Sequence, residues 1–395
     1  MLTSSRPSLA AQIEERLLTR NLVMEEYFAR DATRLATACR EMAERFLKGG
    51  RLLAFGRGPY ATDAQHVSVE FVHPVIVGKR ALPALDLSLS FRPWMEAILL
   101  PEDIVMGFGP PENDHQVLAA LASAQMRGAM TFALPGGHGS FALEPPTNDP
   151  FIHQELIEIL YHTLWETVHV FFEHRELGHD VGASEFLYPY LGQQKQETGD
   201  VISQAAESIQ MKVQEDSRLR ASMAHEAEQI AKTSQAIHER VQRGGKLIIF
   251  GNGGSATDAN DWALDCVQPP DGYRAVPAVS LAMEPANITA VANDVGTEVI
   301  FLRQLIAQAR PEDVVIGIST SGGSKNIVMA LEEARKRNML TVALLGYDGG
   351  EVLRRGLADW PIVIHCDYIP RIQEVQASVY HVMREMFEVI SRGQA

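Results

Sequence analysis

The sequence predicts an α/β protein with two tandem domains. Each is expected to be a doubly wound parallel sheet that is flanked by helices and follows a helical lead-in. Three observations predict this. The chain has 395 residues, enough for two to three domains of roughly 150 residues each. A glycine-rich motif near residue 50 recurs near residue 245. Within each half, short apolar runs alternate with helical patterns, as is typical of parallel sheets.

Three pairs of matching segments indicate an internal duplication. Residues 49–72 read GGRLLAFGRGPYATDAQHVSVEFV, and residues 244–267 read GGKLIIFGNGGSATDANDWALDCV. PEDIVMGFG and PEDVVIGIS begin at residues 101 and 311, and HQELIEILYH and IQEVQASVYH begin at residues 153 and 372. The pairs keep the same order along the chain, so we expect both copies to share one fold.

The elements of each copy follow from these patterns. The copies are assigned to residues 1–174 and 199–395, and the glycine-rich, polar segment 175–198 is assigned as a linker. Apolar residues at helical spacing predict lead-in helices over about 8–48 and 199–243, which pack in the domain or at a dimer interface (Ile13, Leu17, Leu18, Leu22, Ile202, Ile209, Met211). Apolar runs predict strands at 52–55, 103–107 and 130–134, and at 247–250, 313–318 and 340–344. Long helices are expected to close each copy, over about 151–174 and 370–391.

Composition limits the partners and the compartment. The formal net charge of −15 opposes binding to nucleic acid or to an anionic membrane, so an anionic substrate needs local positive potential in its pocket. The three cysteines form no CxxC pattern, which argues against a disulfide framework or a thiolate zinc site. No signal-peptide pattern and no run of about 18 apolar residues is seen, so we expect a cytoplasmic protein without a transmembrane helix.

Two loops in the second copy have the composition of an anion site. Gly251-Asn252-Gly253-Gly254-Ser255 follows one strand, and Ser319-Thr320-Ser321-Gly322-Gly323-Ser324-Lys325 follows the next. Glycines let backbone N–H groups approach an anion, and helix N-termini favour negative charge. Simple helix capping is the alternative for either loop alone, but the pair favours a phosphate monoester. GNGGSA is not a GxGxxG fingerprint, and no Walker A lysine is present, so no nucleotide cofactor is expected.

In these motifs the chain resembles the sugar isomerase (SIS) domain, specifically the sedoheptulose 7-phosphate (phosphoheptose) isomerase family. The second copy carries the resemblance over nearly its whole length, through FGNGGSATDAND, TAVANDVG, GISTSGGSKNIVMALEEA, ALLGYDGG and RIQEVQASVYHVM. The first copy is similar through FGRGPYATDAQHVSVEF, PEDIVMGFG and HQELIEILYH. Members of that family are single-domain subunits of tetramers. The resemblance therefore implies that the tandem chain forms a homodimer that is a pseudo-tetramer of SIS domains.

The resemblance also implies roles for particular residues. The family has a His and a Glu four apart, and a Gln and a His eight apart, as zinc ligands and acid/base groups. The first copy matches all four, with His66, Glu70, Gln154 and His162. The second copy has Asp261, Asp265, Gln373 and His381 at these places, and Glu284 stands where the family has an aspartate. The second copy alone keeps the phosphate residues, which are Asn252, Gly253, Ser255, Ser319, Thr320, Ser321 and Ser324.

The first copy departs from the family at its loops. Arg57, Pro59 and Tyr60 replace the phosphate-type residues, and Gly109-Pro110-Pro111-Glu112 replaces the serine loop. The helical spacing of His66 with Glu70 gives a two-ligand platform for a metal, with a surface or core histidine as the alternative. For Asp261 and Asp265 the alternative is a solvated helix face beside Trp262.

We therefore expect an aldose–ketose isomerase for a sedoheptulose 7-phosphate-like sugar, acting through an enediol, with zinc as the candidate cofactor. Asp265 is the candidate base and His381 the candidate acid or proton shuttle, while Glu70 and His162 are the corresponding groups of the first copy. An aspartate in place of glutamate shifts the carboxylate by about 1.5 Å, which matters for proton transfer. A non-catalytic phosphosugar-binding regulator or scaffold is the competing hypothesis. A phosphosugar enzyme of different chemistry is the third.

Overall fold

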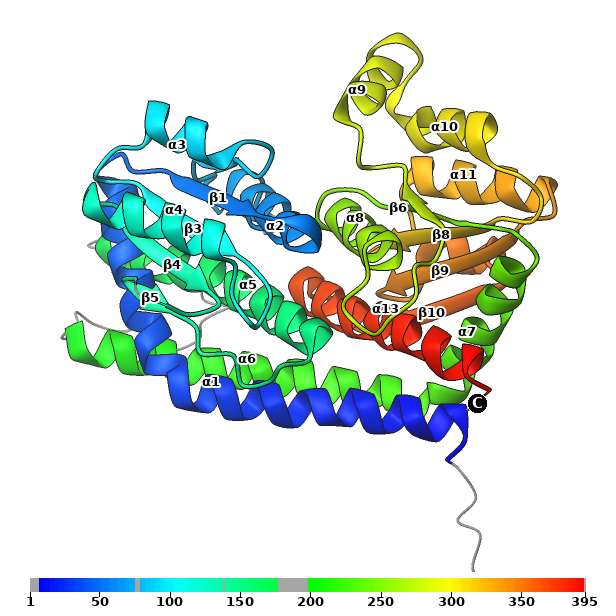
Figure 1. The fold of residues 1–395 in the computed structure, drawn as a ribbon, viewed down its shortest axis with the longest axis horizontal. Helices are drawn as coiled ribbons and strands as arrows, with labels where there is room; N and C mark the ends of the chain where they lie inside the picture. Colours follow the sequence, from blue (N-terminus) through cyan, green and yellow to red (C-terminus); the bar gives the residue numbers. More distant parts are fainter. Residues whose placement is uncertain (1–6, 75–78, 138, 177–197, 394–395) are drawn as a thin grey trace, which may run out of the picture. The chain divides into compact units, whose positions relative to one another are not determined.

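The computed structural model describes residues 7–74, 79–137, 139–176 and 198–393 (Figure 1). Its strands form two five-stranded sheets. The first contains β1 (Leu52–Gly56), β2 (Ala84–Asp86), β3 (Ile104–Phe108), β4 (Met130–Leu134) and β5 (Phe141–Ala142). The second contains β6 (Leu247–Phe250), β7 (Ala278–Ser280), β8 (Val314–Ser319), β9 (Leu340–Gly346) and β10 (Trp360–Ile364).

Both sheets are parallel, and their topologies match strand for strand. The orders are β2-β1-β3-β4-β5 and β10-β9-β8-β6-β7, which are the same order read from opposite edges. The structure therefore confirms the predicted duplication and the doubly wound α/β class. The six predicted strands are all present, with ends that differ by no more than two residues. The short strands β2, β5 and β7 and the strand β10 were not predicted.

Helices cover both faces of each sheet. In the first half these are α1 (Leu9–Leu47), α2 (Ala61–Val72), α3 (Phe91–Ile98), α4 (His115–Met126) and α5 (Pro150–Glu176). In the second half they are α6 (Thr198–His225), α7 (Ala227–Gln242), α8 (Gly254–Val267), α9 (Pro285–Asp294), α10 (Ile300–Gln308), α11 (Lys325–Lys336), α12 (Gly350–Arg354) and α13 (Ile369–Ser391). The predicted second lead-in helix is in fact two helices, because α6 ends at His225 and α7 begins after its N-cap residue, Glu226.

Alternation along the strands separates two apolar cores in each half. Leu52 and Ala54 of β1 pack with α2 and α5, whereas Leu53 and Phe55 pack with α3 and α4. The second sheet repeats this division, with one core against α7, α8 and α13 and the other against α10 and α11. Successive side chains of a strand point to opposite faces, so each apolar strand supplies both cores.

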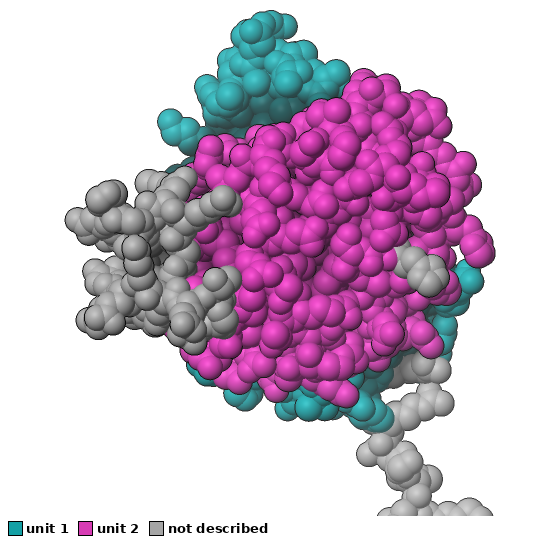
Figure 2. Space-filling model, turned by 90° about the vertical axis from the view of Figure 1, so that its left-hand side faces the viewer, with its two compact units in different colours: residues 1–22, 216–395 teal, residues 23–215 magenta. Residues whose placement is uncertain are grey.

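By contacts, the chain divides into two compact units, which are distinguished by colour in Figure 2. Unit 1 comprises residues 1–22 and 216–395 and holds the second sheet, and unit 2 comprises residues 23–215 and holds the first. The start of each lead-in therefore belongs to the sheet of the other copy. Ile13 and Leu17 are buried in the core of unit 1, and Ile209 is buried in the core of unit 2.

Not every apolar lead-in residue is buried. Leu18, Leu22 and Met211 are 40%, 71% and 54% exposed, so these three do not pack in the core of their units, and their burial at a dimer interface stays a prediction. Residues 177–197, nearly all of the predicted linker, lie outside the described part of the chain. Among the described helices, none combines the length and apolar character needed to cross a membrane.

Candidate active site in unit 1 and its counterpart in unit 2

Two helices bring the candidate acid/base residues of unit 1 together. Asp261 and Asp265 are four residues apart on α8 and share one face, and Gln373 and His381 share one face of α13. These faces meet because α8 packs on α13. All four residues are buried, with at most 5% of their surface exposed. The alternative of a solvated helix face for the two aspartates is therefore wrong.

The imidazole of His381 lies between the two carboxylates. Its Nε2 atom is 3.2 Å from Oδ2 of Asp265 and 3.3 Å from Oδ2 of Asp261. The hydroxyl of Tyr380 donates a 2.7 Å hydrogen bond to the same oxygen of Asp261, and its ring stacks on Trp262. The Asp261 carboxylate is thus held by two partners, while Asp265 faces the imidazole.

Burial changes the proton affinity of this cluster. The pKa of the Asp265 carboxyl is raised to about 7, chiefly by burial and in addition by the nearby negative charge of Asp261. His381 and Arg384 act in the opposite direction. Arg384 is fully buried, and its guanidinium donates to the backbone oxygen of Asp265. A carboxyl group with a pKa near neutrality can both accept and release a proton at physiological pH.

The two phosphate-type loops of unit 1 lie side by side after β6 and β8. Asn252 and Asn326 exchange hydrogen bonds of 3.0 and 2.9 Å through their side-chain amides, which join the loops. Oγ of Ser319 accepts a hydrogen bond from the backbone N–H of Gly322, whose φ of 59° suits glycine. A Cβ atom on Gly322 would lie 2.2 Å from the backbone oxygen of Gly349, so a side chain cannot be placed there.

The N-terminus of α11 completes this loop. Ser324 is the N-cap residue, and its side chain makes no capping hydrogen bond within the described structure. Ser255 lies in the first turn of α8 and is buried. Thr320, Ser321 and Gly253 are at least partly exposed, so polar groups of both loops can reach a ligand from solvent. Glu284 has a different role: it caps α9 by accepting a hydrogen bond from the N–H of Ala286.

The counterpart loops of unit 2 are closed by an internal ion pair. In the repeat, Asp114 stands at the place of Ser324, and Arg57 stands at the place of Asn252. The Asp114 carboxylate accepts hydrogen bonds from the N–H groups of Gln116 and Val117 at the start of α4. Nη1 of Arg57 lies 2.7 Å from its other oxygen. A side-chain carboxylate thus occupies the helix N-terminus that would otherwise face an anion.

Unit 2 instead carries a buried histidine cluster. His66 on α2 and His162 on α5 have ring centroids 5.1 Å apart, and Glu158 on α5 offers a carboxylate oxygen within 4.8 Å of both imidazoles. Oε1 of Glu70 is 3.9 Å from Nε2 of His66. His66, Glu70 and His162 of the predicted set thus come together, and the amide nitrogen of Gln154 donates to Asp63.

Glu158 is the residue that the sequence reasoning missed. It lies four residues after Gln154 and four before His162, so its place on the shared face of α5 was available from the spacing. The corresponding residue of unit 1 is Ala377. Asp261, Asp265 and His381 form the equivalent three-residue group there, with donor atoms also within 4.8 Å of one another.

Comparisons with known proteins agree with this architecture. A family model described as SIS domain matches residues 210–346. The phosphoheptose isomerase of Geotalea daltonii is 38% identical over 184 residues, which are 46% of this chain and 95% of that protein. The chain belongs to the SIS-domain family. The phosphoheptose isomerase of Trichlorobacter lovleyi is 42% identical over 160 residues, which are 40% of this chain and 81% of that protein.

A solved structure shows the same SIS-type fold over both units. The C-terminal domain of glucosamine-fructose-6-phosphate aminotransferase from Francisella tularensis aligns with a TM-score of 0.55. It covers 95% of this chain and 96% of that chain at 9% identity, so it bears on the fold alone. The SIS match over residues 210–346 includes both phosphate-type loops of unit 1.

Proposed function

We propose that the chain is a phosphosugar aldose–ketose isomerase that acts on a sedoheptulose 7-phosphate-like sugar in unit 1. The observation that carries the proposal is the position of the His381 imidazole. Its Nε2 atom lies 3.2 Å from the carboxylate of Asp265 and 3.3 Å from that of Asp261. Both aspartates are buried on α8, the helix that begins at the first phosphate-type loop. The sugar named here is the substrate class of the phosphoheptose isomerases to which the chain is related.

The phosphate is bound by the hydroxyl-rich loops of unit 1. Ser319, Thr320, Ser321 and Ser324 supply hydroxyl groups, and the N-termini of α8 and α11 supply favourable dipoles. From Ser255 in the first turn of α8, Asp261 and Asp265 lie about 9 and 15 Å further along the helix axis. A sugar phosphate anchored at the loops therefore extends along α8 toward the two carboxylates.

The acid/base steps are assigned to Asp265 and His381. Asp265 removes a proton from C1 of the ketose, the electron pair forms the C1–C2 double bond, and His381 donates a proton to the C2 oxygen. In the second step of the reaction, a proton is returned to C2, and the C1 hydroxyl loses its proton to give the aldehyde. Burial of both groups excludes water from the enediol. The elevated pKa of Asp265 matches it to this exchange.

The residues present fit a divalent metal in both units. Two imidazoles and a carboxylate are a normal zinc donor set, and His66, Glu158 and His162 provide it in unit 2. In unit 1 the donors are Asp261, Asp265 and His381. Nε2 of His381 is 3.2 and 3.3 Å from the two carboxylate oxygens, close to the separation of about 3.4 Å between two ligand atoms of a tetrahedral zinc ion. Zinc held by these atoms would act as a Lewis acid that polarises the sugar carbonyl in place of the proton from His381, and it would leave Asp265 its second carboxylate oxygen for the proton of C1.

A charge placed in the phosphate loop tests the proposed anchor. We expect Ser324→Asp to weaken binding of sedoheptulose 7-phosphate by about 10²-fold or more, because like charges in contact cost several kcal/mol. The substitution gives unit 1 the residue that unit 2 has in Asp114. Ser324→Asn is the matched control, since it changes size similarly without adding charge, and should weaken binding much less. Titration calorimetry measures both. Equal binding by wild type and Ser324→Asp would rule out this loop as the phosphate site.

A non-catalytic phosphosugar-binding regulator is the second candidate. The observation that favours it is the burial of the acid/base cluster, in which Asp265 and His381 are each 1% exposed. A buried imidazole between two carboxylates can also serve as a structural polar network. The two candidates share the phosphate anchor and differ in turnover.

A further inference from the structure

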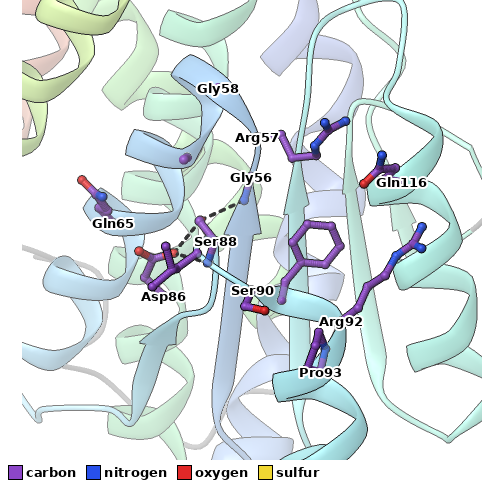
Figure 3. Close-up of a pocket in the computed structure, with 13 residues that line it drawn as sticks. Gly56, Arg57, Gly58, Gln65, Asp86, Ser88, Ser90, Arg92, Pro93 and Gln116 are labelled. Atoms are coloured by element: carbon purple, nitrogen blue, oxygen red, sulfur yellow. Dashed lines mark hydrogen bonds between the residues drawn. The ribbon is translucent and has the colours of Figure 1, made fainter.

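A cavity of about 560 Å³ lies in unit 2, away from its histidine cluster. It opens at the carboxyl ends of β1 and β2, between the turn that follows β1 and the N-terminus of α3 (Figure 3). Its volume is in the range of small-molecule sites, which is about 300–1,000 Å³. The ends of parallel strands are where ligands bind in such folds.

One side of the cavity is cationic. Figure 3 shows Arg57 and Arg92 on the same side, together with Gln116. In the part of the chain that the structure describes, the exposed Arg92 takes part in no ion pair or hydrogen bond. Arg57 uses Nη1 for Asp114, and its side chain is 47% exposed. Guanidinium groups present planar forks of donors that match carboxylate and phosphate oxygens.

The opposite side carries hydroxyl-binding groups. Oδ1 of Asp86 accepts hydrogen bonds of 2.9 and 2.6 Å from the N–H and Oγ of Ser88, and Oγ of Ser88 in turn accepts one from the N–H of Gly56. These hydrogen bonds fix the Asp86 carboxylate at the cavity wall (Figure 3). A fixed carboxylate with a further oxygen to offer is a good acceptor for sugar hydroxyls, and a poor neighbour for an anion.

The repeat shows that this lining is specific to unit 2. Arg57 and Arg92 correspond to Asn252 and Ala286 in unit 1, so both positive charges are new. Ser90 corresponds to Glu284, and each of the two is the N-cap residue of its helix, α3 or α9. Relative to unit 1, unit 2 therefore has two further cations around this cavity, while Asp86 at the place of Ser280 offsets the loss of Glu284, in a chain whose net charge is −15.

We propose that this cavity is a second ligand site, which binds an anionic polyol by its phosphate or carboxylate at Arg57 and Arg92 and by its hydroxyls at Asp86. Such a ligand carries a charge at one end and hydroxyls along its length, as the two walls require. The site does not use the loops after β3, where Asp114 already occupies the helix N-terminus. It is independent of turnover in unit 1.

Titration calorimetry on the full chain tests the site. Ser324→Asp serves as background, so that binding in unit 1 is weakened. Sorbitol 6-phosphate and gluconate are the probes, sorbitol is the uncharged control, and inorganic phosphate is the control without hydroxyls. We expect at least one of the two probes to bind with one site per chain and with tenfold or higher affinity than either control. Phosphate and carboxylate recognition are separated by which probe binds more tightly.

Charge substitutions locate that binding. Arg92→Ala should weaken it by about tenfold or more, and Ser90→Glu, which restores the acid of unit 1, should do the same. Arg40→Ala removes an equal charge from α1 outside the cavity and should leave the affinity unchanged. Arg92 and Ser90 are exposed, so the melting temperature should stay within a few degrees of the background chain. Absence of binding by both probes, or binding that is unaffected by Arg92→Ala, would overturn the proposal.

Discussion

We expect His381→Ala to lower kcat for sedoheptulose 7-phosphate by about 10²–10⁴-fold, the usual contribution of a positioned acid or base. The imidazole is in contact with both carboxylates of the unit 1 cluster, and its removal takes away the proposed proton donor. Binding of the sugar phosphate should change little, because the phosphate loops are on other elements. Steady-state kinetics and calorimetry on the same preparation separate the two effects.

His162→Ala is the matched control for this prediction. It removes the corresponding histidine of unit 2, which is also buried. That histidine belongs to the cluster of His66, Glu158 and His162, which could hold a metal. We expect kcat to remain within about threefold of wild type, because the anion position of unit 2 is taken by Asp114. An equal loss of turnover in both variants would contradict the assignment of the reaction to unit 1. It would favour catalysis by Glu70 and His162 as well.

The largest expected effect on stability is at Arg220 in α6. Its guanidinium is fully buried and donates to Asp216, Asn21 and Ser378, which lie on α6, α1 and α13. These bonds tie both lead-in helices to α13 within unit 1. Burial raises the pKa of Asp216 to about 6 even beside Arg220, so this carboxylate depends on its partner. Arg220→Met should lower the free energy of unfolding by about 3–5 kcal/mol, the usual cost of breaking a buried pair.

Two comparison variants give this prediction a sharp form. The double variant Arg220→Met with Asp216→Leu should recover most of the loss, because no buried charge is then left without a partner. Lys232→Ala breaks an ion pair whose two side chains are 55% and 70% exposed, and should cost well under 1 kcal/mol. Urea denaturation measures all three. A loss below 1 kcal/mol for Arg220→Met would show that the buried pair does not hold the lead-in helices.

The fold was predictable because the chain contains it twice. Each apolar strand is bounded by glycine or polar turns, and the repeat aligns the strands of one copy with those of the other. The lead-in helices show the limit of this reasoning. Apolar spacing predicts that Ile13 and Ile209 are buried, but both cores are built from the same residue types. Only the contacts show that the first part of each helix packs on the core of the other copy's sheet.

The candidate site was predictable in its residues and less so in its environment. Helical spacing placed Asp261 with Asp265 and Gln373 with His381, but it could not show that the packing of α8 on α13 buries them. Glu158 was missed because the ligand pattern expected on that helix contained only a glutamine and a histidine, and Glu158 lies between them. The sequence could not show that Asp114 occupies the helix N-terminus where unit 2 would otherwise bind an anion. Its hydrogen bonds to the N–H groups of α4 and to Arg57 depend on how the loops fold, which only the structure shows.

Turnover of sedoheptulose 7-phosphate by the purified full chain tests the central claim most directly. The aldose product is followed by its anomeric proton in NMR spectra, zinc is measured on the same sample, and a parallel reaction contains EDTA. We predict that an aldoheptose 7-phosphate forms and that Ser324→Asp abolishes its formation at the same substrate concentration. The contradicting result is no product from wild type under any metal condition, while the sugar phosphate still raises the melting temperature. That outcome would make unit 1 a binding module rather than an isomerase.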